Sequence, residues 1–519
     1  GSPYSVQITF VGFGTQKKTG YTLGQNQQVN VDFVMNGHGT QVTAQNVLTG
    51  EKATEPTEPS EEGYTFGGWY KDVNLSIEYS VSTTMPAESI TLYACWTEEN
   101  KPTDFTYTGT TELTISKYNG TGETLWIPSY IGGVPVTALE SSSCANHYEI
   151  TTVVVPETTT KIDGGAFKGC NSIENITLPF VGCSEAGSEA HLYQNGFGYI
   201  FGTYECKESN AKTSSSEYTS SGFGRVYPFH YCYFVPKSVR NITITVQKYI
   251  PACAFYNCDL LESITFKQNI DTVGRHAFYN CTALKRLNSK IDGLFNIPSG
   301  VTSIGENAFY GVAELYNVSL PDTVTSIGYS AFRECTSLTK VAMSSSVTSI
   351  GAEAFSGCTA ITMFNSENEG ELIIPSGCET IGSYAFCNLI LITKVVVPET
   401  TTKIGCGAFN GCTSIVNITL PFVGYSETGS KDQLYQNGFG FIFGYYEYGD
   451  ASAKTSSLVE YTCSGYGSHN YQYYCYYVPK SVRNITITVQ KNIPAHAFYG
   501  CDLLESITFK QNIDTVGEY

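Results

Sequence analysis

The sequence is poor in the residues that several large classes of protein depend on. Lys and Arg total 29 against 47 Asp and Glu, which gives a net charge of -18 over 519 residues. Proteins that bind a phosphate backbone need clustered basic residues, so this composition argues against a nucleic-acid partner. No run approaches the 18 or more consecutive apolar residues of a membrane helix. We therefore expect neither nucleic-acid binding nor membrane insertion by this chain.

The motifs of common enzymes and metal proteins are also missing. The chain has no C-x-x-C, no H-E-x-x-H, no G-x-S-x-G and no Asp-rich calcium loop. His276 and Cys281 are five residues apart, but the repeat described below directs the His outward and the Cys inward. The glycines of 196–202 have the wrong spacing for a dinucleotide loop and predict a turn instead. We expect no catalytic residue, no cofactor and no metal.

The residues that are abundant favour strands and tight turns. Tyr (38), Phe (28) and Gly (50) are frequent, Met (4) is scarce, and only 15% of residues are charged. Disordered chains show the opposite balance of charge and aromatic residues, so disorder of the whole chain is excluded. The composition predicts a mostly β protein.

An internal repeat decides the fold class. The pair Ala-Phe recurs at intervals of 23 or 31 residues between Ala254 and Ala408, and Ser143-Cys144 is a degenerate first copy. A short stretch with apolar residues at alternate positions follows each pair, such as Ile264 and Phe266, and predicts a strand with one buried face. One unit cannot bury this face alone, so we expect about ten stacked coils that form a solenoid.

Comparison of the repeats with one another shows which positions vary and which are kept. The residue before the Ala varies freely, which predicts a position that faces solvent. The third residue after the Phe is usually Cys but is Val312 and Leu389 in two copies, which predicts small buried side chains. Disulfides between Cys of neighbouring coils are the alternative for a chain with 18 Cys. Cys residues that do not occupy this repeat position, such as Cys206 and Cys232, can still form disulfides within the insertions.

A longer duplication is superimposed on the repeat. The segments 153–162 and 235–248 recur at 395–404 and 478–491, and each copy carries a Tyr-rich insertion, near 180–240 and 422–483. Tyrosine is enriched in recognition surfaces because its ring is rigid and amphipathic. Packing of the insertions over the solenoid flank is the alternative. The predicted interaction surface consists of Tyr227, Tyr231, Tyr233, Tyr471, Tyr473, Tyr474, Tyr476 and Tyr477.

The regions outside the repeat suggest further domains. Residues 1–28 form a segment of unknown role, which can belong to the first domain, and 29–98 predict a small β domain with aromatic residues between Gly and Pro turns. The acidic segment 99–104 predicts a linker, and 105–519 is the solenoid. The repeat predicts another Ala-Phe pair just after the last residue, so we expect a solenoid cut within a coil, with an exposed apolar edge.

Two resemblances follow from these motifs. The pattern IG-x-x-AF-x-x-C-x-x-L, with the opening phrase IPSYIGGVPV, resembles the BspA-like leucine-rich repeat over 105–519. EGYTFGGWY, MPA and TLYACW resemble the Listeria–Bacteroides repeat, a β-grasp-like B-repeat module, over about 29–96. These resemblances imply a mostly β protein, with a leucine-rich-repeat solenoid after a small β-grasp-like domain. They also imply an extracellular or cell-surface bacterial protein that acts by adhesion, not catalysis.

Three hypotheses for function follow. The first is an interaction protein that binds a host or bacterial surface protein or a glycan, as a monomer or with end-to-end association through the last coil. The second is a stalk that presents another domain. The third is a glycan-processing enzyme, which is disfavoured because the Asp and Glu residues show no recurrent pairing.

Overall fold

The computed structural model describes most of the repeat region and part of the N-terminal region. The described residues are 28–34, 45–48, 64–70, 78–79, 90–98, 101–186, 192–206, 218–226, 229–428, 438–447, 461–464, 474–495, 497–498 and 501–517. The chain divides into two compact units, residues 1–137 with 154–158 and residues 138–153 with 159–519. The predicted domain boundaries at 28, 98 and 104 stay predictions.

The first unit contains a five-stranded sheet with the order β2-β1-β5-β3-β4. Strands β1 and β5 are parallel, and the other neighbours are antiparallel. Trp69 of the GYTFGGWY phrase and Leu92 are buried, in agreement with the predicted β domain. The elements of this part of the chain are β1 (Gln28–Val34), β2 (Gln45–Leu48), β3 (Tyr64–Tyr70), β4 (Glu78–Tyr79), β5 (Ile90–Glu98), η1 (Pro102–Asp104), β6 (Phe105–Thr108), β7 (Leu113–Tyr118), β8 (Thr124–Trp126), β9 (Tyr130–Ile131) and β10 (Val134–Leu139).

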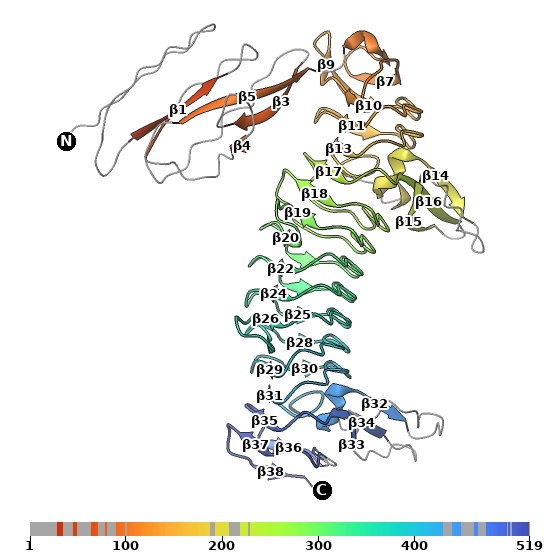
Figure 1. Cartoon of the computed structure of the whole chain (residues 1–519). Helices are drawn as coiled ribbons and strands as arrows, with labels where there is room; N and C mark the ends of the chain where they lie inside the picture. The colour runs from red at the N-terminus through yellow and green to blue at the C-terminus, as the bar shows by residue number, and fades with distance from the viewer. Residues whose placement is uncertain are drawn as a thin grey trace, which may run out of the picture. The chain divides into compact units, whose positions relative to one another are not determined.

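The second unit lies within the predicted solenoid of 105–519, and a large parallel sheet runs along it (Figure 1). Strands such as β17 bury alternate residues, Ile242 and Ile244, and leave the residues between them half-buried. The strands of this sheet that follow β10 in the sequence are β11 (Thr152–Val154), β13 (Asn175–Leu178), β17 (Asn241–Ile244), β18 (Ser263–Phe266), β19 (Arg286–Leu287), β20 (Leu294–Asn296), β22 (Asn317–Ser319), β24 (Lys340–Ala342), β26 (Met363–Phe364), β27 (Glu371–Ile373), β29 (Lys394–Val396), β31 (Asn417–Leu420), β35 (Asn484–Ile487) and β37 (Ser506–Phe509).

Each coil continues from the large sheet to a second short strand and then to the Ala-Phe turn. A Gly follows most of these second strands because neighbouring coils approach closely there. A Cβ on Gly328 would lie 2.7 Å from the main-chain nitrogen of Glu306 in the previous coil. The short strands are β12 (Lys161–Ile162), β21 (Ser303–Ile304), β23 (Ser326–Ile327), β25 (Ser349–Ile350), β28 (Thr380–Ile381), β30 (Lys403–Ile404), β36 (Asn492–Ile493) and β38 (Thr515–Val516).

The Ala-Phe turn is bracketed by two residues with left-handed backbone. In the coil of Ala331 and Phe332 these are Ser330 and Glu334, with φ of 49° and 60°. Main-chain hydrogen bonds connect the turns of successive coils, as from the Phe332 N–H to the carbonyl oxygen of Ala354 at 2.8 Å. The predicted solvent exposure of the residue before the Ala is wrong for Ser330, which is 1% exposed. Side chains of adjacent coils are about 5 Å apart there and cover one another.

The buried Phe side chains form a stacked column. Successive rings from Phe255 to Phe409 are 5.1 to 5.8 Å apart and nearly parallel. The Cys residues at this position lie beside the column and are buried from Cys170 to Cys412, whereas Cys501 in the last coil is half-buried. Val312 and Leu389 take the same place in their coils and are buried. The prediction of small buried side chains at this position is confirmed.

The 31-residue spacings have a structural cause. Their extra eight residues add one strand to the large sheet, because Leu287 of β19 pairs with Phe295 of β20, and Phe364 of β26 pairs with Leu372 of β27. On the other side of the coil no extra turn appears, and Phe278 stacks directly on Phe309. The large sheet therefore has more strands than the about ten coils predicted from the Ala-Phe pairs.

The last described coil is exposed at its outer face. Leu503, Ile507 and Val516 are 41%, 38% and 75% exposed. End-to-end association through this coil stays a prediction.

Candidate interaction surface

Both insertions leave the solenoid after a strand of the large sheet and return at the next strand. Strand β13 pairs directly with β17, and β31 pairs directly with β35. The elements between them are η2 (Leu192–Asn195), η3 (Phe197–Phe201), β14 (Thr203–Cys206), β15 (Tyr218–Val226) and β16 (Phe229–Pro236) in the first copy, and η5 (Phe439–Phe443), β32 (Tyr445–Glu447), β33 (Tyr461–Ser464) and β34 (Tyr474–Pro479) in the second.

A short 3-10 helix in each insertion takes the place of an Ala-Phe turn. The Phe197 N–H of η3 donates to the carbonyl oxygen of Ala254 at 2.7 Å, and the Phe167 N–H donates to that of Ile200 at 2.9 Å. Phe201 contacts Phe167, and Phe197 contacts Phe255, so the Phe column continues through η3. In the second copy, Phe439 of η5 makes the same bond to Ala497. The start of each insertion is thus part of the solenoid.

A buried Gln fixes the first loop of each insertion. The Oε1 of Gln247 accepts from the Val181 N–H at 3.1 Å, and its Nε2 donates to the carbonyl oxygen of Glu185 at 3.1 Å. In the second copy Gln490 makes both bonds, to Val423 at 2.8 Å and to Glu427 at 2.9 Å. Both Gln side chains are at most 1% exposed. The repeated phrase VQK therefore holds the insertion in place.

Serine closes the other end of each insertion. The Ser238 Oγ donates to the carbonyl oxygen of Ile173 at 2.6 Å, and the Ser481 Oγ donates to that of Ile415 at 2.7 Å. Both serines belong to the phrase VPKSV, where the chain re-enters the solenoid. Each insertion is anchored by the same contacts at both ends.

The outer part of each insertion is a three-stranded antiparallel sheet. The orders are β14-β16-β15 and β32-β34-β33, and we call these sheets insertion sheet 1 and insertion sheet 2. Both project from the side of the solenoid opposite the large sheet (Figure 1). The central strands β16 and β34 carry the Tyr-rich phrases that were predicted to form the interaction surface. The duplication therefore presents two equivalent sheets on one side.

The predicted tyrosines differ in their placement. Tyr227, Tyr471 and Tyr473 lie outside the described residues, whereas Tyr231 and Tyr233 lie in β16, and Tyr474 and Tyr477 lie in β34. Tyr476, which the candidate surface included, is 3% exposed. It lies over η5, where a Cβ on Gly440 would be 2.2 Å from the Cβ of Tyr476. Tyr476 therefore belongs to the anchor of the insertion.

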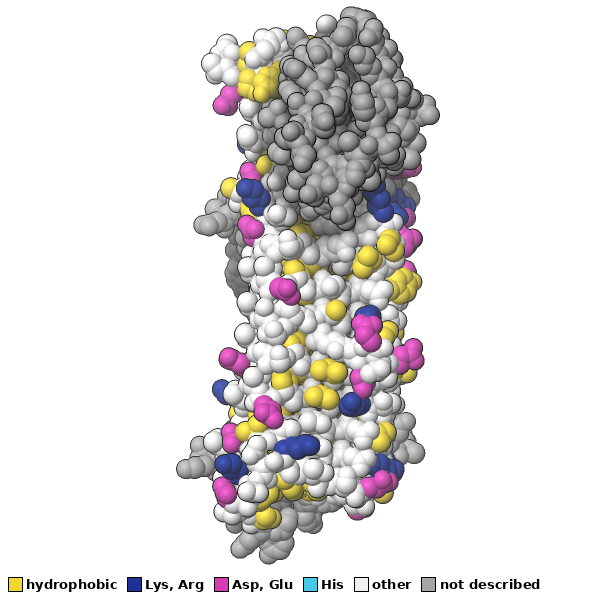
Figure 2. Space-filling model, turned by 90° about the vertical axis from the view of Figure 1, so that its left-hand side faces the viewer, with side chains coloured by type: hydrophobic (Ala, Val, Ile, Leu, Met, Phe, Trp, Pro, Cys, Tyr) yellow, Lys and Arg dark blue, Asp and Glu magenta, His cyan; other side chains and the backbone are white. Residues whose placement is uncertain are grey.

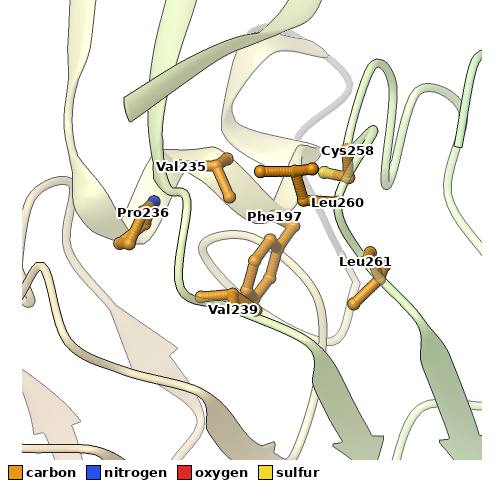
Figure 3. A pocket seen from close by; sticks show the side chains of 7 residues that line it. All are labelled: Phe197, Val235, Pro236, Val239, Cys258, Leu260 and Leu261. Carbon is orange, nitrogen blue, oxygen red and sulfur yellow. The ribbon is translucent and has the colours of Figure 1, made fainter. Parts of the chain in front are cut away.

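A small apolar cavity lies where the first insertion meets the next coil. It is lined by Phe197 of η3, by residues at the end of β16 and by Cys258, Leu260 and Leu261 (Figure 3). Its volume of about 10 Å³ is near the lower limit for one water molecule. A small-molecule site usually needs several hundred cubic ångströms, so this cavity does not fit such a ligand.

A second group of tyrosines lies directly beyond insertion sheet 1. Tyr256, Tyr279 and Tyr310 follow the buried Phe of three successive coils, and we call them the tyrosine stack. Their ring centroids are 4.8 and 4.6 Å apart, with interplanar angles of 5° and 13°. All three are half-buried. The phrase AFY recurs at these positions, so the sequence contained a signal for this surface.

Two residues frame the tyrosine stack. The Arg333 guanidinium lies 5.9 Å from the Tyr310 ring and forms an ion pair with Glu353. The ring of His276 contacts Tyr256 and Tyr279 at 6.1 and 5.5 Å. Burial, with the nearby phenol of Tyr279, raises the pKa of Tyr256 to about 12, so this hydroxyl stays protonated at neutral pH. Tyr and Arg together are typical of the residues that dominate binding energy at protein interfaces.

The face of the large sheet is mainly polar (Figure 2). Asn241 donates through Nδ2 to the Oδ1 of Asn175 at 2.9 Å, and Ser263 donates to Asn241 at 2.6 Å. Asn484 repeats the first of these bonds with Asn417. The Asn-Ile-Thr sequences therefore act as strand residues whose amides bond between coils.

The described residues include no group of three metal-ligating side chains, and none of their helices is long and apolar enough to cross a membrane. The half-buried His276 and the fully buried Cys281 differ in burial, in line with the predicted divergence. These observations concern only the parts of the chain that the structure describes.

The chain belongs to the BspA type leucine rich repeat family. Matches to this repeat region cover residues 137–193, 229–292, 290–373, 362–431 and 468–519, which is more than half of the chain. Residues 30–95 match the Listeria-Bacteroides repeat domain. Both predicted resemblances are confirmed.

Curated relatives match over short stretches. Internalin H of Listeria monocytogenes is 41% identical over 86 residues, which are 16% of this chain and 15% of that protein. A putative Gly-rich membrane protein of Evansella cellulosilytica is 36% identical over 83 residues, or 16% and 10% of the two chains. The chain thus spans a small part of the length of these relatives.

Solved structures match this chain at low identity and with low TM-scores. The pneumococcal vaccine antigen PcpA is 15% identical, with 80% of this chain and 97% of that chain covered and a TM-score of 0.33. A leucine rich cell surface protein from Faecalibacterium prausnitzii is 20% identical, with coverages of 62% and 94% and a TM-score of 0.25.

Proposed function

We propose that this chain belongs to a non-catalytic bacterial protein, located at the cell surface or secreted, that binds a macromolecular partner through its two insertions. The partner is a host or bacterial surface protein or a glycan. The observation that carries this proposal is the identical anchoring of two Tyr-rich sheets on one side of a stacked solenoid. A loop that only covered the solenoid flank would not need a duplicated, hydrogen-bonded base.

The spacing of the two insertions limits the partner. Seven Ala-Phe turns, from Ala254 to Ala408, lie between η3 and η5. Each coil, or rung, of the solenoid adds about 5 Å to its length. The two insertion sheets are therefore roughly 40 Å apart along the stack. A partner that contacts both sheets must be extended or carry repeated binding sites. Binding to both would then raise the apparent affinity by mass action, without any new contact.

The experiment removes each outer sheet and keeps its base. Thr203 of β14 pairs with Tyr233 of β16, so a two-residue Asn-Gly turn can replace residues 204–232 and close a hairpin. Tyr445 and Tyr476 pair in the same way, so the same turn can replace 446–475. The intact chain and the single and double replacements are tested for binding to immobilised collagen, fibronectin, mucin and a glycan array.

We expect the intact chain to bind at least one of these probes and the double replacement to lose this binding while its thermal melting stays cooperative. If one partner contacts both sheets, each single replacement lowers the apparent affinity by more than tenfold. A matched variant with Tyr231, Tyr474 and Tyr477 changed to Ser and with Tyr476 kept tests the tyrosines themselves. Unchanged binding by the double replacement would refute the proposal, and no binding by the intact chain would favour the stalk.

The expected state of the chain in solution is a monomer. The alternative is end-to-end association through the exposed Leu503, Ile507 and Val516. Size-exclusion chromatography of the intact chain beside an Ile507→Glu variant distinguishes the two. A larger species that the substitution dissociates would establish association.

A further inference from the structure

The tyrosine stack places three phenol rings face to face on the outside of the solenoid. Tyr256 and Tyr279 are 23 residues apart in the sequence, and Tyr279 and Tyr310 are 31 apart. In the structure each pair is one rung apart, with ring centroids at 4.8 and 4.6 Å. The Phe rings beneath them are stacked in the same way, at 5.4 and 5.1 Å, and hold the coils in register.

The neighbours of the stack keep the rings in place and leave them reachable. The three tyrosines are only half-buried, so a small oxidant in water can reach their edges. His276 packs against both Tyr256 and Tyr279, and Arg333 covers the outer face of Tyr310. Each ring of the stack has a face covered by a neighbouring ring. This arrangement disfavours a ligand that binds by stacking on a single ring.

We propose that the tyrosine stack is a site of oxidative cross-linking, at which Tyr279 forms a dityrosine bond with Tyr256 or Tyr310. The ring centroids of the two pairs are 4.8 and 4.6 Å apart, so the two rings of a pair must turn toward each other to bring one ortho carbon of each into bonding contact. Tyrosines that are not held side by side must first meet through motion of the chain or collision of two molecules. The solenoid therefore replaces an encounter between two side chains by a fixed arrangement.

Formation of the dityrosine bond requires a two-electron oxidant, and hydrogen peroxide supplies this oxidation. Each of two tyrosines gives one electron and its phenolic proton to the oxidised haem of a peroxidase, which leaves two phenoxyl radicals. One ortho carbon of each ring forms the new carbon–carbon bond. The two ortho hydrogens then move to the phenoxyl oxygens and restore both phenols. One hydrogen peroxide is reduced to two waters, and the protein loses two hydrogen atoms.

Such a bond would join coils that are otherwise held by non-covalent contacts. Because the linked residues are 23 or 31 positions apart, the bond restricts the unfolded chain, as a disulfide does. A bacterial protein exposed to peroxide would become harder to unfold at the coils that follow insertion sheet 1. This consequence does not depend on the identity of any binding partner.

The test treats the intact chain with hydrogen peroxide and a haem peroxidase at low protein concentration. We expect dityrosine fluorescence in the monomer fraction and a mass lower by two hydrogen atoms. After proteolysis, mass spectrometry should find a linked peptide pair that contains Tyr279 with Tyr256 or Tyr310. The oxidised chain should also melt at a higher temperature than the untreated chain.

The decisive variant is Tyr279→Phe, which keeps the ring and the stack but removes the phenol shared by both pairs. We expect this variant to lose the linked peptides and the gain in melting temperature. The matched control is Tyr329→Phe at a tyrosine outside the stack that is 45% exposed, and it should behave like the unmodified chain. Links that map to other tyrosines, no link at all, or links at Tyr256 or Tyr310 that persist in Tyr279→Phe would each overturn the proposal.

Discussion

The Cys281 thiol donates a hydrogen bond to the main-chain carbonyl oxygen of Phe255 in the previous coil, with an Sγ to O distance of 3.0 Å. Cys335, Cys358 and Cys412 make the same bond to the Phe of the coil before them, and Cys170 makes it to Cys144. These Cys residues are free thiols. The ladder of thiols therefore satisfies buried carbonyls, which favours the reduced state over disulfides between coils.

The first prediction concerns alkaline pH. Burial raises the pKa of Cys144 and Cys378 from the ordinary 9.0 to about 12, and that of Cys170 to about 11. Between these values and 9 the folded chain holds more protons than the unfolded chain, so stability is complete below pH 9 and falls as the pH rises. Each such thiol contributes up to about 1.4 kcal/mol per pH unit in this window.

Denaturant melts between pH 7 and 11 measure this effect, beside a Cys281→Val variant as control. Burial also raises the pKa of Cys281 well above 9.0. Val occupies the equivalent position at Val312, so this variant should fold and should lose stability less steeply with pH. A thiol reagent at pH 8 should modify these Cys residues only after denaturation. Rapid modification of the folded chain, or a flat pH profile, would contradict the prediction.

The second prediction concerns the buried Gln of each insertion. Gln247→Ala removes two hydrogen bonds and leaves the buried Val181 N–H without its partner, so it should cost about 1–3 kcal/mol of stability. Gln490→Ala should cost a similar amount because Gln490 makes equivalent bonds. Chemical denaturation measures both, with the exposed Gln268→Ala as control. Equal stability of all three variants would show that the Gln does not anchor the insertion.

The third prediction concerns η3. Phe201 is fully buried in the Phe column, so Phe201→Ala should cost about 3–5 kcal/mol, as much as Phe332→Ala in an ordinary coil. Tyr329→Ala, at an exposed position, should change stability by less than about 0.5 kcal/mol. If Phe201→Ala lowered the stability as little as the Tyr329→Ala control, η3 would not contribute to the core of the solenoid as an ordinary coil does.

The fourth prediction concerns the left-handed residue after the Phe. Glu334 has a φ of 60°, and other coils carry Gly311, Gly357 or Gly411 at this position. Glu334→Gly should leave the free energy of unfolding unchanged or raise it by up to about 1 kcal/mol. Glu334→Val should lower it by about 1–2 kcal/mol because a β-branched residue is strained there. The opposite order of the two variants, measured by thermal melting, would refute this explanation.

Much of the solenoid could be predicted from the spacing of a few residues. The Ala-Phe pairs fixed the repeat length, and the exchange of Cys with Val312 and Leu389 predicted a buried position. These signals are local, because one residue type recurs wherever the same contact recurs in the next coil. The two spacings of 23 and 31 residues were visible in the sequence, but the strand that each longer spacing adds was not, because the pairing of β19 with β20 is a contact of the folded sheet.

The errors share a cause. Ser330 was expected to face solvent because its position varies, yet neighbouring coils cover it. The segment 196–202 was predicted only to form a turn of the insertion, yet its residues Phe197 and Phe201 continue the Phe column. Tyr476 was included in the candidate interaction surface with its neighbours, although it packs over η5. In each case the deciding contact joins residues that are distant in the sequence.

The sequence by itself determined the repeat, the burial of its Phe and Cys residues, the family and the Tyr-rich character of both insertions. All of these depend on patterns along one chain. Only the tertiary structure decided that η3 and η5 act as rungs, that Gln247 and Gln490 anchor the insertions, and that Tyr256, Tyr279 and Tyr310 stack. The reason is that stacking brings positions 23 or more residues apart to within about 5 Å. The sequence alone does not show which of these distant residues come into contact.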